Sequence, residues 1–482
     1  MKIIPTKNEI LLILVLVLCF IGCFRLHERS IKNRAFIHPS QLEYPPLEFT
    51  PPIPERHVLD NGMVIFLLPD HEIPLISISA IIRTGSVYEP EFNVGLADIT
   101  GHVMRTGGTE FMEPEEINKK LEFVAATIET SIERESGSAY LSVLKKDIDL
   151  GMEIFSHILR YPKFRQDKLD IAKQQSIESI RRRNDDPMSI ASREFKKLIY
   201  EGDPRSRVPS IKGIEKITQE DLIKFHHQYF FPNNIILAIS GDFTKDEILG
   251  KLSVFLGDWK ARDTKIGPAP VPHNKKGESI VYGERPLPQS TIVSGHLAIP
   301  NTHPDYYSFN VLNFILGDGG FGSRLVKEIR SNQGLAYSVG SFYRAEKDYG
   351  VFGTYCLTKS SSTARVIDLV KQILDDVKSK GVTEEELKWA KQSIINKFIF
   401  SFSSSGGLVK KYANLEYNQL PMDYLKDYCK KIERVSLYDI QQSAEKYLHP
   451  HNTAIVVVGD SEHFDEPLSK YGTVIEADLS IF

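Results

Sequence analysis

Apolar residues recur along the chain with the two spacings that distinguish strands from helices. A turn at Asn61-Gly62 leads into the apolar run Met63–Leu68, which predicts a strand, and Ile76–Ile82 predicts a second one. Alternating residues around Thr127–Val143 predict a hairpin. Helical spacing predicts helices over 93–106, 114–125, 147–159, 166–184 and 219–228. Antiparallel strands covered by helices on one face place this unit in the α+β class.

The same unit occurs twice along the sequence. The segment Leu169–Ile177 recurs as Leu387–Ile394, and Gln228–Asp242 recurs as Lys446–Asp460. Ala172 and Ala390 of the first pair, and Tyr229 and Tyr447 of the second, are both 218 positions apart. Two separate matches at one offset indicate a tandem duplication.

Length and composition fix the domain plan. At 482 residues the chain is too long for one ordinary hydrophobic core. We expect a first repeat over 55–258, a linker rich in Pro, Lys and Gly over 259–289, and a second repeat over 290–482. The net charge of −4 excludes the basic surface typical of nucleic-acid-binding proteins.

The first residues have the layout of a bacterial lipoprotein signal. Lysines precede the apolar run Ile10–Gly22, which is short for a membrane span, and Phe20–Cys23 is similar to a lipobox. We expect a signal peptide over 1–23, lipidation of Cys23 and a Pro-rich tether over 24–54. The alternative is a plain signal peptide or anchor. A lipidated chain would be a membrane-anchored lipoprotein of the bacterial cell envelope, on the periplasmic side or at the surface.

The cysteines of the body do not suggest a disulfide framework. Beyond the signal region only Cys356 and Cys429 remain, and the sequence has no C-x-x-C spacing that would indicate a structural zinc knuckle. Their role is left open.

Two motifs in the body carry a family resemblance. The first is Gly95-Leu96-Ala97-Asp98-Ile99-Thr100-Gly101-His102, followed by a Gly-Thr turn ending at Thr109. The second is the Gly-rich stretch Leu316–Leu325, followed by Arg330 and, seven residues later, Tyr337. With the duplication, these motifs resemble the M16 (pitrilysin/insulinase-like) zinc peptidases over about residues 54–465. The resemblance implies two tandem α/β-roll repeats.

The resemblance also implies a lost zinc site. The family motif is H-x-x-E-H, and here Asp98 stands at the first His, Gly101 at the general base and His102 at the second His. Ser179, beside Glu178, stands at the third ligand position. Catalytic zinc needs three protein ligands and an open position, so no metal is expected in this chain.

These residues allow two other interpretations. Asp98 and His102 are i, i+4 on one helical face, and Glu178 could join them in a different metal site. We favour a partly buried His102 that is hydrogen-bonded to Asp98 within a degenerate site.

In the resembled family, the residues at Arg330 and Tyr337 face the zinc. A phenol hydroxyl can donate to the oxyanion formed at the scissile carbonyl, and a guanidinium can hold the peptide backbone. The alternative is a solvated arginine at a helix end and a tyrosine packed on the sheet.

The resemblance leaves three functions to compare. The favoured one is the non-metal subunit of a heterodimeric peptidase, with zinc in a partner chain and peptides or unfolded proteins as substrates. A second is an inactive structural scaffold, which has no need of both Arg330 and Tyr337. A third, an autonomous hydrolase, finds no Gly-x-Ser-x-Gly or Cys/His motif.

Overall fold

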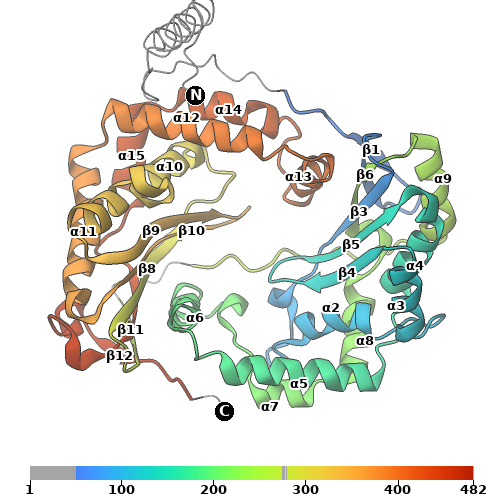
Figure 1. Ribbon diagram of the computed structural model, residues 1–482, viewed down its shortest axis with the longest axis horizontal. Helices are drawn as coiled ribbons and strands as arrows, with labels where there is room; N and C mark the ends of the chain where they lie inside the picture. The colour runs from blue at the N-terminus through green and yellow to red at the C-terminus, as the bar shows by residue number, and fades with distance from the viewer. Residues whose placement is uncertain (1–49, 274–276, 278, 481–482) are drawn as a thin grey trace, which may run out of the picture. The chain divides into compact units, whose positions relative to one another are not determined.

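The computed structural model describes residues 50–273, 277 and 279–480. The expected signal peptide, Cys23 and nearly all of the tether lie outside these residues. The described chain forms two six-stranded sheets, one per repeat, each with its own hydrophobic core (Figure 1). The α+β class is confirmed.

The first sheet has the strand order β1-β2-β6-β3-β5-β4. Its strands are β1 (Glu55–Val58), β2 (Val64–Pro69), β3 (Leu75–Ile82), β4 (Thr127–Ile132), β5 (Gly137–Leu144) and β6 (Ile235–Gly241). The helices of this repeat are α2 (Leu96–Thr106), α3 (Pro114–Phe123), α4 (Ile148–Arg160), α5 (Gln166–Arg182), α6 (Pro187–Ile199), α7 (Ile211–Lys216), α8 (Gln219–Tyr229) and α9 (Lys245–Leu256).

The second sheet has the order β12-β7-β11-β8-β10-β9. Its strands are β7 (Ser279–Glu284), β8 (Gln289–Ala298), β9 (Ala336–Ala345), β10 (Gly350–Lys359), β11 (Ala454–Gly459) and β12 (Val474–Glu476). The helices of this repeat are α10 (Tyr306–Asn313), α11 (Thr363–Lys380), α12 (Glu384–Phe400), α13 (Ser405–Tyr417), α14 (Tyr424–Arg434) and α15 (Leu437–Tyr447).

Both sheets are mixed, which corrects the expectation of purely antiparallel sheets. β2 pairs in parallel with β6, and β7 pairs in parallel with β11 and β12, while the other pairs are antiparallel. Parallel neighbours need long connections. Here β6 and β11 return to their sheets after a series of helices, so β6 can lie parallel to β2 and β11 parallel to β7.

The segment expected as a linker contains a strand. β7 lies within 259–289, and its residues Ile280, Val281 and Tyr282 are buried in the second sheet. The Pro- and Gly-rich composition ends before these apolar residues begin. The second repeat therefore starts earlier than residue 290.

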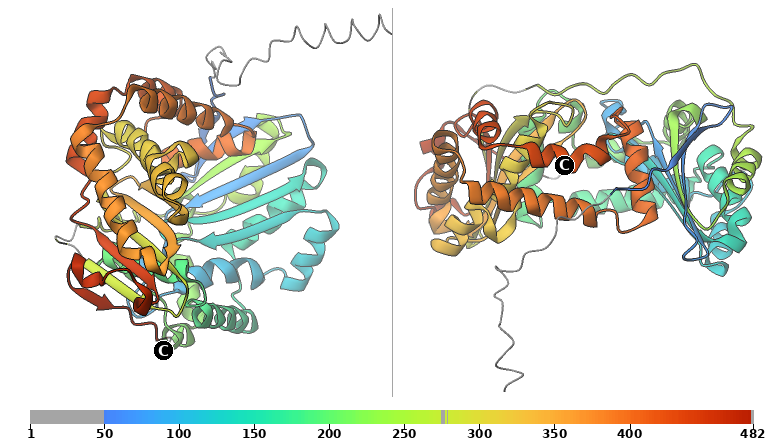
Figure 2. Two further views of the ribbon diagram at one scale, coloured as in Figure 1. Left: turned by 60° about the vertical axis from the view of Figure 1, so that its left-hand side comes forward. Right: turned by 90° about the horizontal axis from the view of Figure 1, so that it is seen from above.

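One helix of each repeat packs on the sheet of the other repeat. Ile190 and Phe195 of α6 share a hydrophobic cluster with Val293 and Val456 of the second sheet. In the same way, α13 packs on β6 and β2 of the first sheet, and Figure 2 shows the orange helix α12 leading toward α13 beside the blue strands. The bounds of α13 are those of α6 moved by the same 218 positions. Each repeat therefore contributes one helix that covers the sheet of the other repeat.

The exchange explains the continuous apolar pattern of two strands. β6 is buried at six successive residues from Ile235 to Ser240, and β11 is buried from Ile455 to Gly459. A strand has such a continuous run of apolar residues when both faces of its sheet are covered. No helix in the described part of the chain is long and apolar enough to cross a membrane.

Candidate functional site

The helix that carries the altered zinc motif, α2, begins at a buried carboxylate. Glu89 accepts hydrogen bonds from the backbone N–H groups of Gly95 (3.1 Å) and Ala97 (2.6 Å). These are N–H groups of the helix start that have no partner within the helix. Burial raises the pKa of Glu89 to about 7, against the lowering effect of these two bonds, and the nearby Asp98 raises it further. Glu89 could not be identified from the sequence, because a single acidic residue before a helix forms no motif.

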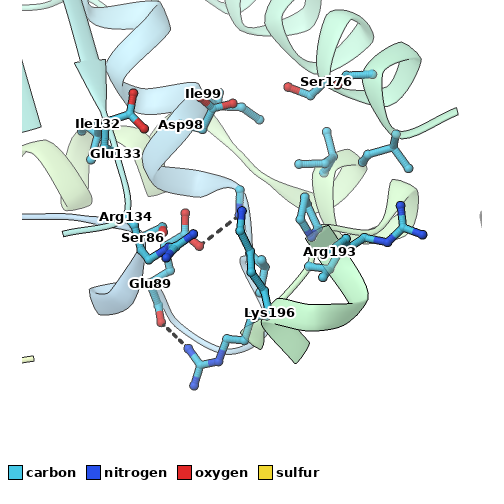
Figure 3. A pocket seen from close by; sticks show the side chains of 18 of the residues that line it. Ser86, Glu89, Asp98, Ile99, Ile132, Glu133, Arg134, Ser176, Arg193 and Lys196 are labelled. Atoms are coloured by element: carbon cyan, nitrogen blue, oxygen red, sulfur yellow. Dashed lines mark hydrogen bonds between the residues drawn. The ribbon is translucent and has the colours of Figure 1, made fainter. Parts of the chain in front are cut away.

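The residues at the zinc-motif positions line an open cavity of about 800 Å³. Asp98 and His102 of α2 lie on one wall, and Ser176 and Ser179 of α5 lie on another. Figure 3 shows Asp98 and Ser176 on their two helices, with Glu133 nearby. The fold thus brings together Asp98, His102 and Ser179, as the family motif implies.

The favoured interpretation of His102 is wrong. His102 is exposed rather than partly buried, and among the described residues no hydrogen bond joins it to Asp98. Asp98 is also exposed to the cavity. Partial burial of its carboxylate nevertheless raises the pKa of Asp98. The charge of His102 opposes this shift, and the charge of Glu133 adds to it.

Gly101 is required by packing. A Cβ atom at this position would lie 2.5 Å from the backbone nitrogen of Ile132 and 2.8 Å from the carbonyl carbon of Ser131, both in β4. Thr130 of the same strand donates a hydrogen bond to the Gly101 carbonyl oxygen at 2.6 Å. The helix and the strand therefore meet where the family has its catalytic Glu, and no side chain fits there.

Glu178 does not complete a different metal site. Its carboxylate pairs with Arg182 (2.9 Å) and Arg181 (3.6 Å) on its own helix, and it does not line the cavity. Residues 50–273, 277 and 279–480 contain no cluster of three or more His, Cys, Asp or Glu side chains suited to a metal ion. The motif positions supply one carboxylate, Asp98, and one imidazole, His102, with Ser179 at the third ligand position. Since Gly101 also leaves no room for the catalytic Glu, the site does not fit catalytic zinc.

Arg330 and Tyr337 lie together on the surface of the second repeat. Arg330 belongs to the π-helical turn Val326–Asn332, and Tyr337 lies at the start of β9. The guanidinium carbon of Arg330 lies 4.9 Å from the centre of the Phe321 ring and 5.9 Å from that of Tyr337. Phe321 is 72% exposed and Tyr337 is 78% exposed. Tyr337 therefore does not pack on the sheet.

The turn between these residues depends on Gly334. Its backbone has a φ of +63°, and its N–H group donates to the Arg330 carbonyl oxygen at 3.2 Å. This left-handed conformation ends the helical turn and directs the chain into β9. In the described part of the chain, the Arg330 guanidinium makes no hydrogen bond or ion pair. Neither Arg330 nor Tyr337 lines the cavity of Asp98 and His102.

The two body cysteines are not joined to each other. Cys356 is buried in β10 and Cys429 is partly buried on α14, and both are free thiols. Burial raises the pKa of both thiols, to about 12 for Cys356.

Comparisons with known proteins identify the family. Residues 65–207 match the family model described as insulinase (peptidase family M16), and residues 216–394 match the model described as peptidase M16 inactive domain. The "non-peptidase homolog YmxG" of Helicobacter pylori is 25% identical over 82% of this chain and 91% of its own length. The "uncharacterized zinc protease YmxG" of Bacillus subtilis is 23% identical over 74% of this chain and 86% of its own length.

Solved structures agree with the fold. A peptidase M16 inactive domain from Pseudomonas fluorescens superposes with a TM-score of 0.78 at 23% identity, covering 86% of this chain and 99% of that one. The duplicated mixed sheets, the two motif frames and the matched models lead to one conclusion: this chain belongs to the peptidase M16 family.

Proposed function

We propose that this chain is the non-metal-binding subunit of a heterodimeric M16-type zinc peptidase. In this proposal it supplies Arg330 and Tyr337 to a site that a zinc-bearing partner chain completes. The observation that carries it is the exposed pair Arg330–Tyr337, whose polar groups make no hydrogen bond or ion pair within the described chain. The same chain has a zinc motif that does not fit zinc.

The geometry of the pair suits a binding role. Phe321 and Tyr337 hold the Arg330 guanidinium through their ring faces, at 4.9 Å and 5.9 Å, which leaves its N–H groups free. Those N–H groups can donate two parallel hydrogen bonds to a peptide. The Tyr337 hydroxyl can donate to the oxygen of the scissile carbonyl, where negative charge develops.

Replacing Tyr337 by Phe tests the proposal. The substitution keeps the ring that contacts Arg330 and removes only the hydroxyl donor. In a complex reconstituted with a zinc-bearing M16 chain that binds this protein, we expect peptide cleavage to fall by roughly 10²–10³ in kcat. Size-exclusion chromatography should show an intact complex.

Tyr438→Phe is the matched control, because Tyr438 is 70% exposed on α15 of the same repeat and belongs to no proposed site. It should leave kcat unchanged. Unchanged turnover by an intact Tyr337→Phe complex would reject the catalytic role of the hydroxyl. An inactive structural scaffold would then be the better description of the chain.

The proposal also includes the location. We place the chain at the bacterial cell envelope as a membrane-anchored lipoprotein acylated at Cys23, on the strength of the lipobox-like residues Phe20–Cys23. Cys23→Ala should move the protein from the detergent phase to the aqueous phase, or leave it unprocessed. Unchanged partitioning of the variant would contradict this anchor.

A further inference from the structure

A second cavity, of about 450 Å³, adjoins the first one. The two cavities share the lining residues Arg134, Met188, Ser192 and Lys196. Figure 3 shows Arg134 and Lys196 on the shared wall. Arg344 of β9 contributes a third cation to the second cavity.

These three cations have no carboxylate partner. Among the described residues, neither the Lys196 ammonium nor the guanidinium of Arg134 or Arg344 lies within 4.0 Å of an acidic oxygen. They lie close enough to influence each other, since burial lowers the pKa of Lys196 and both Arg134 and Arg344 lower it further. Three like charges at one place raise the local positive potential, which attracts an anion.

Two arginines that line the first cavity, Arg193 and Arg205, are paired with carboxylates. Arg205 binds Asp203 at 2.9 Å and Glu135 at 2.7 Å, and Arg193 binds Glu194 at 3.0 Å. These pairs fix the loop before α7 and the surface of α6. The paired arginines thus hold segments of the protein together, whereas the three unpaired cations line the second cavity without an ion-pair partner.

The remaining wall of the second cavity is apolar and aromatic. Phe195 of α6 and Phe342 of β9 meet edge to face at 6.2 Å between ring centres, and Val293 and Val351 lie beside them. The Arg344 guanidinium carbon lies 5.6 Å from the Phe342 ring centre. The Arg134 guanidinium carbon lies 5.6 Å from the ring centre of Tyr200, another lining residue. Both guanidinium groups thus rest on aromatic faces with their N–H groups available.

We propose that this cavity binds the C-terminal carboxylate of a peptide whose last side chain is apolar, with Arg134, Lys196 and Arg344 holding the carboxylate and Phe195 and Phe342 contacting the side chain. A volume of about 450 Å³ is in the range of small-molecule sites and accommodates a terminal residue. The choice of a peptide as the source of the carboxylate rests on the proposed function. The carboxylate site itself does not.

One carboxyl group also lines the cavity. Burial raises the pKa of Glu346 and the charge of Glu135 raises it further, while Arg134, Arg205 and Arg344 oppose this. Even with Glu346 ionised, the three unpaired cations leave the cavity positive. Lowering the pH toward the pKa of Glu346 removes its repulsion, so binding of the peptide carboxylate should strengthen as long as that carboxylate stays ionised.

The test uses this chain alone and a pair of fluorescent peptides that end in Phe. One peptide has a free carboxylate and the other a C-terminal amide. We expect the acid to bind at least tenfold more tightly than the amide, because charge-assisted hydrogen bonds are lost in the amide. N-acetylphenylalanine should compete with the acid, whereas inorganic phosphate should not.

A matched pair of double variants locates the site. Lys196→Gln with Arg344→Gln should remove the preference for the acid. Lys224→Gln with Arg181→Gln removes the same charge from exposed helix positions and should retain the preference. Thermal melting confirms that each variant is folded.

Equal binding of acid and amide would overturn the proposal, and so would equal loss in both double variants. Competition by phosphate as strong as by N-acetylphenylalanine would show an unselective anion patch and would also overturn it. Because no partner chain and no cleavage are involved, failure here leaves the Tyr337 test unaffected.

Discussion

The two motif regions of the molecule differ in which residues of the family motifs they contain. On α2 the backbone frame is retained while the chemistry is gone: Gly95 still starts the helix, and Gly101 now packs against β4. In the second repeat, Arg330 and Tyr337 are both present, and in the described chain their polar groups make no hydrogen bond or ion pair, while the Arg330 guanidinium lies over the exposed rings of Phe321 and Tyr337. A side chain that the fold does not use needs another explanation, and a binding surface provides one.

After Tyr337→Phe, Arg330 should give the largest effect on the active complex. Arg330→Ala removes the hydrogen bonds to the peptide in both the bound substrate and the transition state. We therefore expect KM to rise roughly tenfold or more, with a smaller fall in kcat. Steady-state kinetics with a fluorogenic peptide measure both constants.

Arg330→Lys sharpens the comparison. A lysine keeps the charge and cannot donate two parallel hydrogen bonds from a planar group. Arg330→Lys should therefore show a rise in KM that is smaller than the rise in Arg330→Ala. Kinetics of Arg330→Ala equal to wild type would place both residues among ordinary solvated surface groups.

Substitution of Gly101 should have a smaller effect, which we expect on the stability of the protein. Gly101→Ala brings a Cβ atom against the β4 backbone, so we expect the free energy of unfolding to fall by about 1–3 kcal/mol. Gly250 is the control, because it lies within α9 and a Cβ there meets nothing within 4 Å. Gly250→Ala should raise the stability by up to about 1 kcal/mol.

Urea denaturation of the two variants gives these differences. An unchanged or raised stability of Gly101→Ala would mean that α2 can move away from β4. The position could then accept a catalytic Glu, and the contrast between the two motif regions would lose its physical basis.

The duplication and most elements could be predicted from the sequence, because apolar spacing and the repeated segments are local signals. The exchange of α6 and α13 could not. Ile190 and Phe195 show that α6 has an apolar face, but nothing in that spacing says which of two similar sheets it covers. β7 was missed because it follows a Pro- and Gly-rich segment directly.

At the site, the sequence identified the positions and not their environments. Asp98, His102 and Ser179 do share a cavity, yet the exposure of His102 depends on how far α2 and α5 stand apart. The cation group of Arg134, Lys196 and Arg344 comes from three elements distant in sequence, and no motif links them.

One experiment tests the central claim most directly, which is that this chain has no zinc site and works only with a zinc-bearing partner. Zinc content after dialysis and peptide cleavage should be measured for this chain, for an M16 chain with an intact zinc motif that binds it, and for their mixture. We expect no stoichiometric zinc in this chain, zinc in the other chain, and cleavage only by the mixture. One tightly held zinc per molecule of this chain, or cleavage by either chain alone at the rate of the mixture, would contradict the account.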